Sequence, residues 1–477
     1  MSETHKTEEQ LATAPIGRLM LKLAVPTVAA QLINMLYNIV DRIYIGHIPE
    51  VGSTALTGVG VTFPIITLVS AFAAFAGQGG APLASIRLGA GRRDEAERIL
   101  GNSLILLLAA SLLLTVGFSI YKKPILYAFG ASDATITYGV DYIRIYLLGT
   151  VFVQLALGLN TFISAQGKAL VAMLSVLIGA FLNIILDPIF IFVLDMGVTG
   201  AAVATVIGQF CGCILALIFN LKKNKEIHLQ FRGFRPNWRL VGNIYAIGLP
   251  SVIMVAIGSV MTFCMNKILI AYHSAKETAA TAFGIYFKLN SFIFMPVFGL
   301  NNGMVPIVAY NYGAQNRLRM VETIKRSTIY ASCIMVLGVI IFWAIPGPLL
   351  KIFDATDTML QVGVPALRII SLSFCMAGAC IALGSSFQAL GKAVYSMTTS
   401  IIRQLVFLVP IAYVLARYGH SIGNDDLVWW SYPLAEIASL LVTLVFFGRL
   451  YRTLIAPLPA NGGAPVHDDS DDDPIGE

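Results

Sequence analysis

Four polar residues share one face of an otherwise apolar segment near the start of the chain. In INMLYNIVDRIYIG, residues 33–46, they are spaced i, i+3, i+4 and i+7: Asn34, Tyr37, Asn38 and Asp41. This spacing places all four on one side of a helix. An ionisable group inside a membrane costs at least about 3 kcal/mol and normally faces the protein interior or a water-filled cavity. The pattern therefore predicts a polar face directed into the protein.

A second acidic side chain lies in FLNIILDPIFI, residues 181–191. Asn183 precedes Asp187 by about one helical turn, so the two side chains share a face. Pro188 follows directly and has no backbone N–H to donate to a regular helix. The segment therefore predicts an acid and an amide side by side at a helix irregularity.

Counting from the predicted helix ends places Asp41, Asp187 and Thr205 at one depth, in the outer half of the membrane. Asn160 lies nearer the inner side and matches this depth less well. Two carboxylates, the Asn183 amide and a hydroxyl form an all-oxygen group of the kind that hard cations prefer. Neighbouring carboxylates repel, which favours proton uptake. We expect the group to bind Na+, a proton, or each in turn; the alternative, that it only pins helix packing through hydrogen bonds, stays open.

Membrane-spanning helices must position these side chains. Of the 477 residues, 57% are hydrophobic and 12% are charged, against roughly 45–50% and about 25% in soluble proteins. A helical span needs ~20 apolar residues, and we predict twelve such runs. They begin near residues 19, 54, 96, 135, 169, 198, 242, 278, 322, 358, 393 and 427. Most of the 32 Lys and Arg residues then lie on one side, which predicts a cell (inner) membrane protein with both termini in the cytoplasm and no nucleic-acid site.

The sequence also shows an internal duplication. Pairs of identical residues recur at a constant offset of 224 positions: Pro26 and Pro250, Thr54 and Thr278, Pro82 and Pro306, Gly89 and Gly313, Gly167 and Gly391. Each copy holds six predicted spans, and an even number leaves both copies in the same orientation. We therefore predict an all-α polytopic membrane protein with two six-helix lobes related by a pseudo-twofold axis along the membrane normal, as in transporters that bind substrate between repeats.

The predicted parts of the chain follow from this duplication. They are a cytoplasmic N-terminal segment (1–17), an N-lobe (18–221), a basic cytoplasmic link (222–240), a C-lobe (241–455) and an acidic, disordered tail (456–477).

Basic side chains replace acids in the second half. Lys288 is predicted near the middle of the eighth span and Arg403 in the inner third of the eleventh. Lys267 and Glu436, both in outer thirds, could pair. For each of these residues, internal pairing or contact with the membrane surface is favoured over substrate contact. Met295 belongs to an aromatic and Met-rich stretch that could line an adaptable cavity for planar ligands, although such residues more often lie in a core or face lipid.

Three stretches resemble the multidrug and toxic compound extrusion (MATE) transporters, in particular the MepA-like branch. They are LAVPTVAAQLINMLYNIVDRIYIG, NIILDP and FGIYFKLNSFIFMPVFGLNNGMVPIVAYNYGA, and the resemblance extends over residues 18–455. It implies a twelve-helix, two-lobed antiporter that exports cationic or amphipathic compounds in exchange for Na+ or H+.

The resemblance also implies roles for single residues. The first-helix acid of the family matches Asp41, the fifth-helix Asn and Asp match Asn183 and Asp187, and the sixth-helix Thr matches Thr205. A bend in the first helix matches Pro26. The acidic second-lobe residues of many relatives have no counterpart in this sequence.

We therefore expect a secondary active multidrug efflux antiporter that works by alternating access, is a monomer in the bilayer and needs no cofactor beyond the coupling ion, H+ or Na+. Its cavity or substrate path is expected to include Asn34, Tyr37, Asn38, Asn160, Lys288 and Met295. The alternative is a lipid-linked precursor flippase, which would use Lys288 and Arg403 on a phosphate headgroup. A membrane enzyme is not expected, because no catalytic set of His, Ser or metal ligands was found, and the loops hold no phosphate-binding motif.

Overall fold

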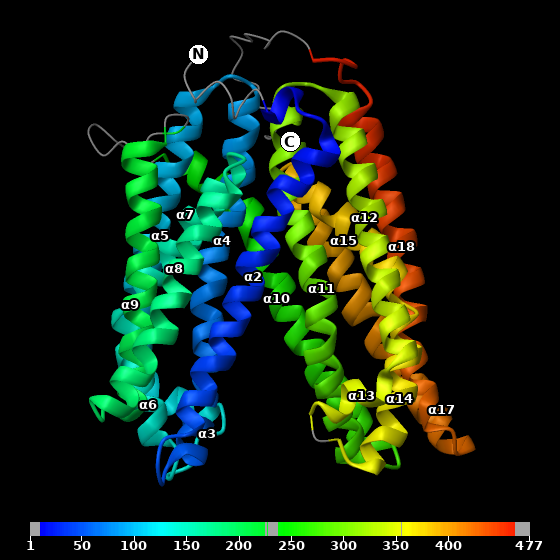
Figure 1. The fold of residues 1–477 in the computed structure, drawn as a ribbon. Helices are drawn as coiled ribbons and strands as arrows, with labels where there is room; N and C mark the ends of the chain where they lie inside the picture. The colour runs from blue at the N-terminus through cyan, green and yellow to red at the C-terminus, as the bar shows by residue number, and fades with distance from the viewer. Residues whose placement is uncertain (1–9, 225–226, 228–236, 354, 463–477) are drawn as a thin grey trace. The chain divides into compact units, whose positions relative to one another are not determined.

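The computed structural model describes residues 10–224, 227, 237–353 and 355–462, and within these ranges it contains helices and no strand (Figure 1). The predicted N-terminal segment, link and acidic tail lie largely outside the described residues. The α-helices are α2 (Ile16–Gly46), α3 (Gly52–Gly60), α4 (Phe63–Gly89), α5 (Arg93–Ala128), α6 (Ile136–Leu148), α7 (Thr150–Ala165), α8 (Ala169–Pro188), α9 (Gly197–Ile218), α10 (Trp238–Tyr272), α11 (Lys276–Gly313), α12 (Arg317–Ala344), α13 (Pro346–Lys351), α14 (Asp357–Ser371), α15 (Phe374–Ala389), α16 (Ala393–Ile401), α17 (Val409–Ile422) and α18 (Ser431–Leu450). Shorter π- or 3₁₀-helical turns are η1 (Ile189–Val193), η2 (Phe219–Lys223), η3 (Ile402–Leu408), η4 (Asp425–Trp430) and η5 (Tyr451–Ile455).

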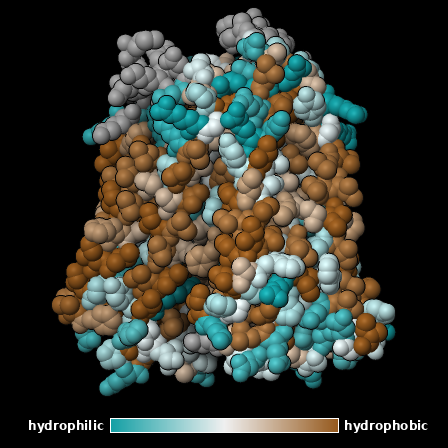
Figure 2. Space-filling model, turned by 45° about the vertical axis from the view of Figure 1, so that its right-hand side comes forward, coloured by the Kyte–Doolittle hydropathy of each residue, from teal (hydrophilic) through white to brown (hydrophobic). Residues whose placement is uncertain are grey.

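The long helices are of the length and composition needed to cross a membrane. Within the described residues there are 10 such spans, or up to 12 if each of two bent helix pairs counts as one. Figure 2 shows hydrophobic side chains over the middle of the helices and hydrophilic ones toward their ends. The chain is thus an all-α polytopic membrane protein, as the composition predicted.

Both bent pairs were predicted from the sequence as single straight spans. α6 and α7 meet at 57°, and α14 and α15 meet at 50°. The first break lies at Gly149, and the second lies at Leu372 and Ser373, with Ser373 224 positions after Gly149. A side chain at Gly149 would come within 2.5 Å of Val206 on α9, so the break coincides with a close helix approach. The duplication in sequence is therefore repeated as a duplicated irregularity in structure.

The described residues form two compact units. Unit 1 holds Val25–Val252 and the described residues before Pro15, and unit 2 holds Pro15–Ala24 and the described chain from Ile253 onward. The division thus runs inside α2 and α10, whereas the sequence-based lobes meet in the link between residues 222 and 240. Pro26 and Pro250 lie within two residues of the two division points. Because proline removes one backbone hydrogen bond from a helix, each of these helices has a weak point where it passes between units.

Glycines bring α8 and α9 into backbone contact within unit 1. A Cβ atom at Gly179 would lie 2.9 Å from the carbonyl oxygen of Gly208, and one at Gly208 would lie 2.6 Å from that of Gly179. Neither position can therefore hold a side chain unless the two helices move apart. This contact places Asn183, one turn beyond Gly179, opposite the polar face of α9.

Candidate functional site

Two buried carboxylates lie close together in unit 1, one on α2 and one at the end of α8. Asp41 is 7% exposed and Asp187 is 0% exposed, and the charge of Asp41 acts on Asp187. Oδ1 of Asp41 and Oδ2 of Asp187 are buried and have no hydrogen-bond partner among the described residues. A buried acceptor without a partner is costly. Both acids therefore present an unsatisfied oxygen that a proton or a cation would satisfy.

Asn183 connects the acid of α8 to α9. Its Nδ2 donates a hydrogen bond of 3.1 Å to Oδ1 of Asp187 and one of 3.3 Å to Oγ1 of Thr205. Asn183 is 2% exposed and Thr205 7%. Oδ1 of Asn183 is a third buried acceptor without a partner among the described residues.

The helix that carries Asp187 changes its winding immediately after it. α8 ends at Pro188, and η1 continues as a π-helix in which the N–H of Leu194 donates to the carbonyl of Ile189 at 2.9 Å. Proline cannot donate to the preceding turn, and π-helical turns are rare and occur frequently at functional sites. The irregularity predicted from the sequence thus lies directly beside the buried acid.

A cavity of about 40 Å³ lies between α2, α7, α8 and α9 within unit 1, and polar and apolar residues line it in equal number. Its wall includes five residues predicted for the site: Asn34, Tyr37, Asn160, Asn183 and Thr205. A cavity holds a water molecule once its volume reaches about 10–15 Å³, so this one is large enough for a small hydrated group. Its wall continues to the unsatisfied oxygen of Asn183.

Asn160 belongs to this cavity although its counted depth matched the acids less well. Its Oδ1 accepts a hydrogen bond of 2.8 Å from Oγ of Ser175 on α8. Because the cavity extends along the helices, residues at different depths contribute to one wall.

Some residues on the polar face of α2 line the cavity or are buried, and one is exposed. Asn34 and Tyr37 line the cavity, and Asp41 is buried. Asn38 is exposed, and its Nδ2 donates 2.6 Å to the backbone oxygen and 3.1 Å to the side-chain oxygen of Asn34. Asn38 thus orients Asn34 instead of lining the cavity.

Among the polar residues that sequence reasoning missed at this site, two line the cavity. Nε2 of Gln209 donates to the Tyr37 hydroxyl at 3.5 Å, and Gln209 lies on the cavity wall. Ser175, which holds Asn160, is the second. Gln209 follows Thr205 by one helical turn, so the same periodicity that grouped the residues of α2 would have found it.

No group of three or more His, Cys, Asp or Glu side chains that could hold a metal ion occurs in the described part of the chain. The oxygen set in unit 1 therefore depends on two acids supplemented by neutral oxygens.

The candidate residues of unit 2 lie apart from one another. Lys288 on α11 is exposed, and its ammonium lies 5.5 Å from the centre of the Phe353 ring. Met295 is half-buried, two turns further along the same helix. Neither residue belongs to the cavity of unit 1.

The predicted pairing of Lys267 with Glu436 is wrong. Oε1 of Glu436 lies 3.7 Å from a guanidinium nitrogen of Arg403, whereas the Lys267 ammonium lies over the Phe263 ring, 5.7 Å from its centre. Arg403 lies in η3, a seven-residue π-helix. Because η3 packs against α18, helix packing brings Arg403 to Glu436, and the counted depth of a residue in its span does not select this partner.

A known protein family matches this chain twice, once in each repeat. The MatE family model matches residues 26–189 and 250–414, and the two matches begin at the paired prolines, 224 residues apart. Multidrug export protein MepA of Staphylococcus haemolyticus is 27% identical over 441 residues, which is 92% of this chain and 95% of that protein. MepA of Staphylococcus aureus is 25% identical with the same coverage.

Solved structures are similar over almost the whole fold. A MOP superfamily transporter from Pyrococcus furiosus, described as having a binding pocket of reverse polarity, has a TM-score of 0.87 at 22% identity and covers 95% of this chain and 99% of its own. A MATE transporter in a bent conformation has a TM-score of 0.86 at 23% identity, covering 94% and 99%. These likenesses establish the fold.

Proposed function

Since the chain belongs to the MatE family of multi-pass membrane transporters and is not an enzyme, we propose that it is a secondary active antiporter that exports cationic or amphipathic compounds. The MepA relatives are named as multidrug export proteins, and their similarity extends over nearly the full chain. We extend that substrate class to this protein.

The observation that carries the proposal is the pair of unsatisfied buried carboxylate oxygens in unit 1. Asp41 and Asp187 lie within a low-dielectric environment and each lacks a partner at one oxygen. Binding of a cation would remove net negative charge and satisfy these acceptors together. Its release would restore a negative site that attracts a cationic drug, so that cation and drug alternate.

The coupling ion in this proposal is H+ or Na+, with no other cofactor. A proton would bridge or neutralise the two acids. A sodium ion would take oxygen ligands from Asp41, Asn183, Asp187 and Thr205, which is the kind of ligand a hard cation prefers. The unsatisfied Oδ1 of Asn183 supports a role for the amide as one of these ligands.

The conformational step is assigned to α2. We propose that it bends at Pro26, where the helix lacks a backbone hydrogen bond and passes from one unit to the other. Drug is proposed to contact polar, apolar and basic side chains of both repeats, namely Asn34, Tyr37, Asn38, Asn160, Lys288 and Met295. The transporter would act as a monomer in the inner membrane with both termini in the cytoplasm.

Transport by purified protein in vesicles tests this function. Efflux of a fluorescent cationic dye is measured under an imposed pH gradient and, separately, an imposed Na+ gradient. We expect Asp41→Asn and Asp187→Asn each to lower gradient-driven efflux at least tenfold, whereas Asp141→Asn, an exposed acid on α6, leaves it unchanged. Efflux that persists in the double variant Asp41→Asn/Asp187→Asn would overturn the site assignment.

The same vesicles separate this function from lipid-linked precursor flipping. A flippase would use Lys288 and Arg403 on a phosphate headgroup, but Arg403 is already paired with Glu436, so one of the two basic groups is engaged elsewhere. We therefore expect dye transport without competition from a lipid-linked phosphate. Flipping of such a lipid without dye transport would contradict the antiporter proposal and support the flippase.

A further inference from the structure

Unit 2 contains an ion pair between a buried acid and a half-buried arginine that the proposed transport cycle does not use. Glu436 on α18 is 7% exposed, and its Oε1 lies 3.7 Å from a guanidinium nitrogen of Arg403. This separation is longer than a charge-assisted hydrogen bond of about 2.7–2.9 Å. Arg403 thus neutralises the carboxylate charge while Oε1 keeps no hydrogen-bond partner among the described residues.

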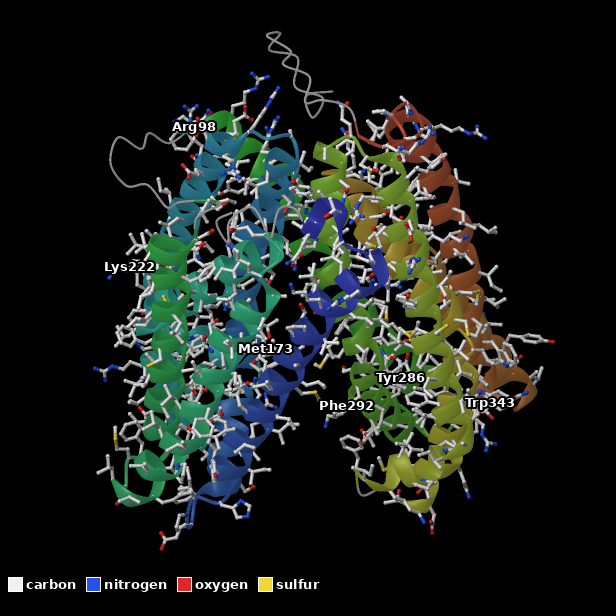
Figure 3. The ribbon with its side chains drawn as sticks, turned by 45° about the horizontal axis from the view of Figure 1, so that its top comes forward. Arg98, Met173, Lys222, Tyr286, Phe292 and Trp343 are labelled. Carbon is white, nitrogen blue, oxygen red and sulfur yellow. The ribbon has the colours of Figure 1, made fainter. Side chains whose placement is uncertain are left out.

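The other polar groups beside Glu436 are the side chains of a tyrosine and a cysteine. They come from two helices packed in unit 2: Tyr286 on α11, labelled in Figure 3, and Cys380 on α15. Sγ of Cys380 in turn accepts a hydrogen bond of 3.9 Å from Ser439, and Tyr432 stacks edge-on against Tyr286. The cation that balances this acid is therefore the arginine.

The internal duplication relates this pair to the cavity of unit 1. Residues that line that cavity have these counterparts 224 positions later: Asn34 and Gly258, Tyr37 and Met261, Asn160 and Gly384, Ser175 and Thr399, Gly179 and Arg403. Where the first repeat has a glycine on the cavity wall, the second repeat has the guanidinium.

Two of these counterparts, Met261 and Gly258, lie near residues that are close to the ion pair in space or in sequence. Met261, the counterpart of Tyr37, accepts a hydrogen bond of 3.8 Å from the Tyr432 hydroxyl. A Cβ atom at Gly258, the counterpart of Asn34, would lie 3.8 Å from the side chain of Gln404, the residue after Arg403. The second repeat thus places a long, charged side chain and its neighbours where the first repeat leaves polar space.

We propose that the guanidinium of Arg403 is a tethered cation for Glu436, so that unit 2 holds a latent site for a monovalent cation or a proton that the arginine occupies permanently. Removal of the arginine charge opens this site. If the proposed function is correct, unit 2 takes no part in ion coupling, and the coupling ion binds at the acids of unit 1 alone.

The test uses full-length protein in an Asp41→Asn/Asp187→Asn background, so that cation binding in unit 1 cannot interfere. In that background, Arg403→Met removes the charge and keeps much of the side-chain length, and Arg403→Lys keeps the charge. Glu436→Gln and the double variant Arg403→Met/Glu436→Gln complete a double-mutant cycle. Thermal unfolding in detergent is followed at pH 5 to 9 in choline chloride, and at constant pH 8 with NaCl in place of choline chloride.

We expect Arg403→Met to be strongly destabilised at pH 8 in choline, because it buries an uncompensated carboxylate. Lowering the pH should restore its stability if the opened site takes a proton, and NaCl should restore it if the site takes Na+. Arg403→Lys should unfold near the parent temperature. The double variant should be more stable than Arg403→Met at pH 8, because no charge is left buried.

Purely additive effects in the cycle, together with no rescue by low pH or Na+, would overturn the proposal. If Arg403→Met does not fold at pH 8, recovery of folded protein from the double variant supports the proposal, and failure of both variants contradicts it. Because the readout is unfolding in a background without the unit 1 acids, a negative efflux result would leave this outcome unaffected.

Discussion

The side-chain amide of Asn183 donates a hydrogen bond of 3.1 Å to Oδ1 of Asp187, one turn further along α8. Its second amide hydrogen reaches Oγ1 of Thr205 on α9. One neutral side chain thus fixes the orientation of a buried acid and ties it to the neighbouring helix. The remaining oxygens of Asp187 and Asn183 are left without partners in the described structure.

Replacement of Asn183 should therefore affect both stability and ion binding. Asn183→Ala leaves Asp187 with two unsatisfied oxygens, and a lost partner for a buried group costs about 1–3 kcal/mol. We expect a lower unfolding temperature in detergent and a weaker stabilisation by the coupling cation. Asn424→Ala is the matched control, because Asn424 is an exposed amide in the turn before η4 and makes no side-chain cap hydrogen bond. Equal effects of the two variants would contradict the bridging role of Asn183.

The backbone contact between α8 and α9 predicts a strict requirement for glycine. In Gly208→Ala the new methyl group would lie 2.6 Å from the carbonyl oxygen of Gly179, so the helices must separate. Overpacking of this kind typically costs about 1–3 kcal/mol, and it would also lengthen the contact between Asn183 and Thr205. Thermal unfolding measures the loss. Gly117→Ala on α5, where nothing lies within 4 Å of the added atom, should unfold like the wild type; a comparable loss there would contradict the packing argument.

Loss of the proline in α2 should slow the transport cycle without removing the ion site. Pro26→Ala restores a backbone donor where the helix passes between units and would stiffen it. We expect a several-fold lower rate of dye efflux and an unchanged stabilisation by the coupling cation. Pro124→Ala, also inside a helix but wholly within unit 1, serves as the control. A wild-type rate of dye efflux in Pro26→Ala would contradict the proposed hinge at Pro26.

His273, in the turn between α10 and α11, predicts a pH dependence of stability outside the membrane spans. Its side chain is 7% exposed, and its Nδ1 accepts a hydrogen bond of 3.1 Å from the N–H of Ala275. Burial lowers the pKa of His273, and this effect exceeds the opposing attraction of Asp425 and Asp426. Below pH ~6.5 the unfolded chain therefore binds a proton that the folded chain refuses, so the stability contribution is present above that pH and lost as the pH falls.

The unfolding temperature at pH 7.5 and at pH 5.5 checks the histidine prediction. His273→Gln cannot titrate in this range, so the decrease between the two pH values should be smaller in this variant than in the wild type. His47→Gln, which replaces an exposed histidine at the end of α2, should keep the wild-type decrease. An unchanged decrease in His273→Gln would show that another group causes the dependence.

Much of the architecture was predictable because the membrane restricts the choices. Apolar length and the positive-inside bias predicted a polytopic helical protein, and the 224-residue offset predicted repeats that recur in the structure as paired prolines and paired bent helices. Helical periodicity placed Asn183 beside Asp187, which the structure shows as a hydrogen bond. These inferences concern one helix at a time or one helix and its repeat, where spacing along the chain fixes direction.

The side-chain partners between helices were less predictable. The expected pair was Lys267 and Glu436, but the structure pairs Glu436 with Arg403, because η3 packs against α18. The cavity wall likewise combines Tyr37 with Gln209, and Asn160 with Ser175, from different helices. Counting along each span could not supply these contacts, since they depend on helix rotation.

The sequence by itself determined that acids, amides and a hydroxyl lie inside membrane helices, since their types and spacing allow no other placement at an acceptable solvation cost. Only the tertiary structure decided which of their oxygens remain without partners. That depends on the close approach of α8 and α9 at Gly179 and Gly208, which brings Asn183 to Thr205 and leaves one oxygen of Asp187 unsatisfied. Hydrogen bonds form only within a distance range a few tenths of an ångström wide, and packing between helices sets these distances.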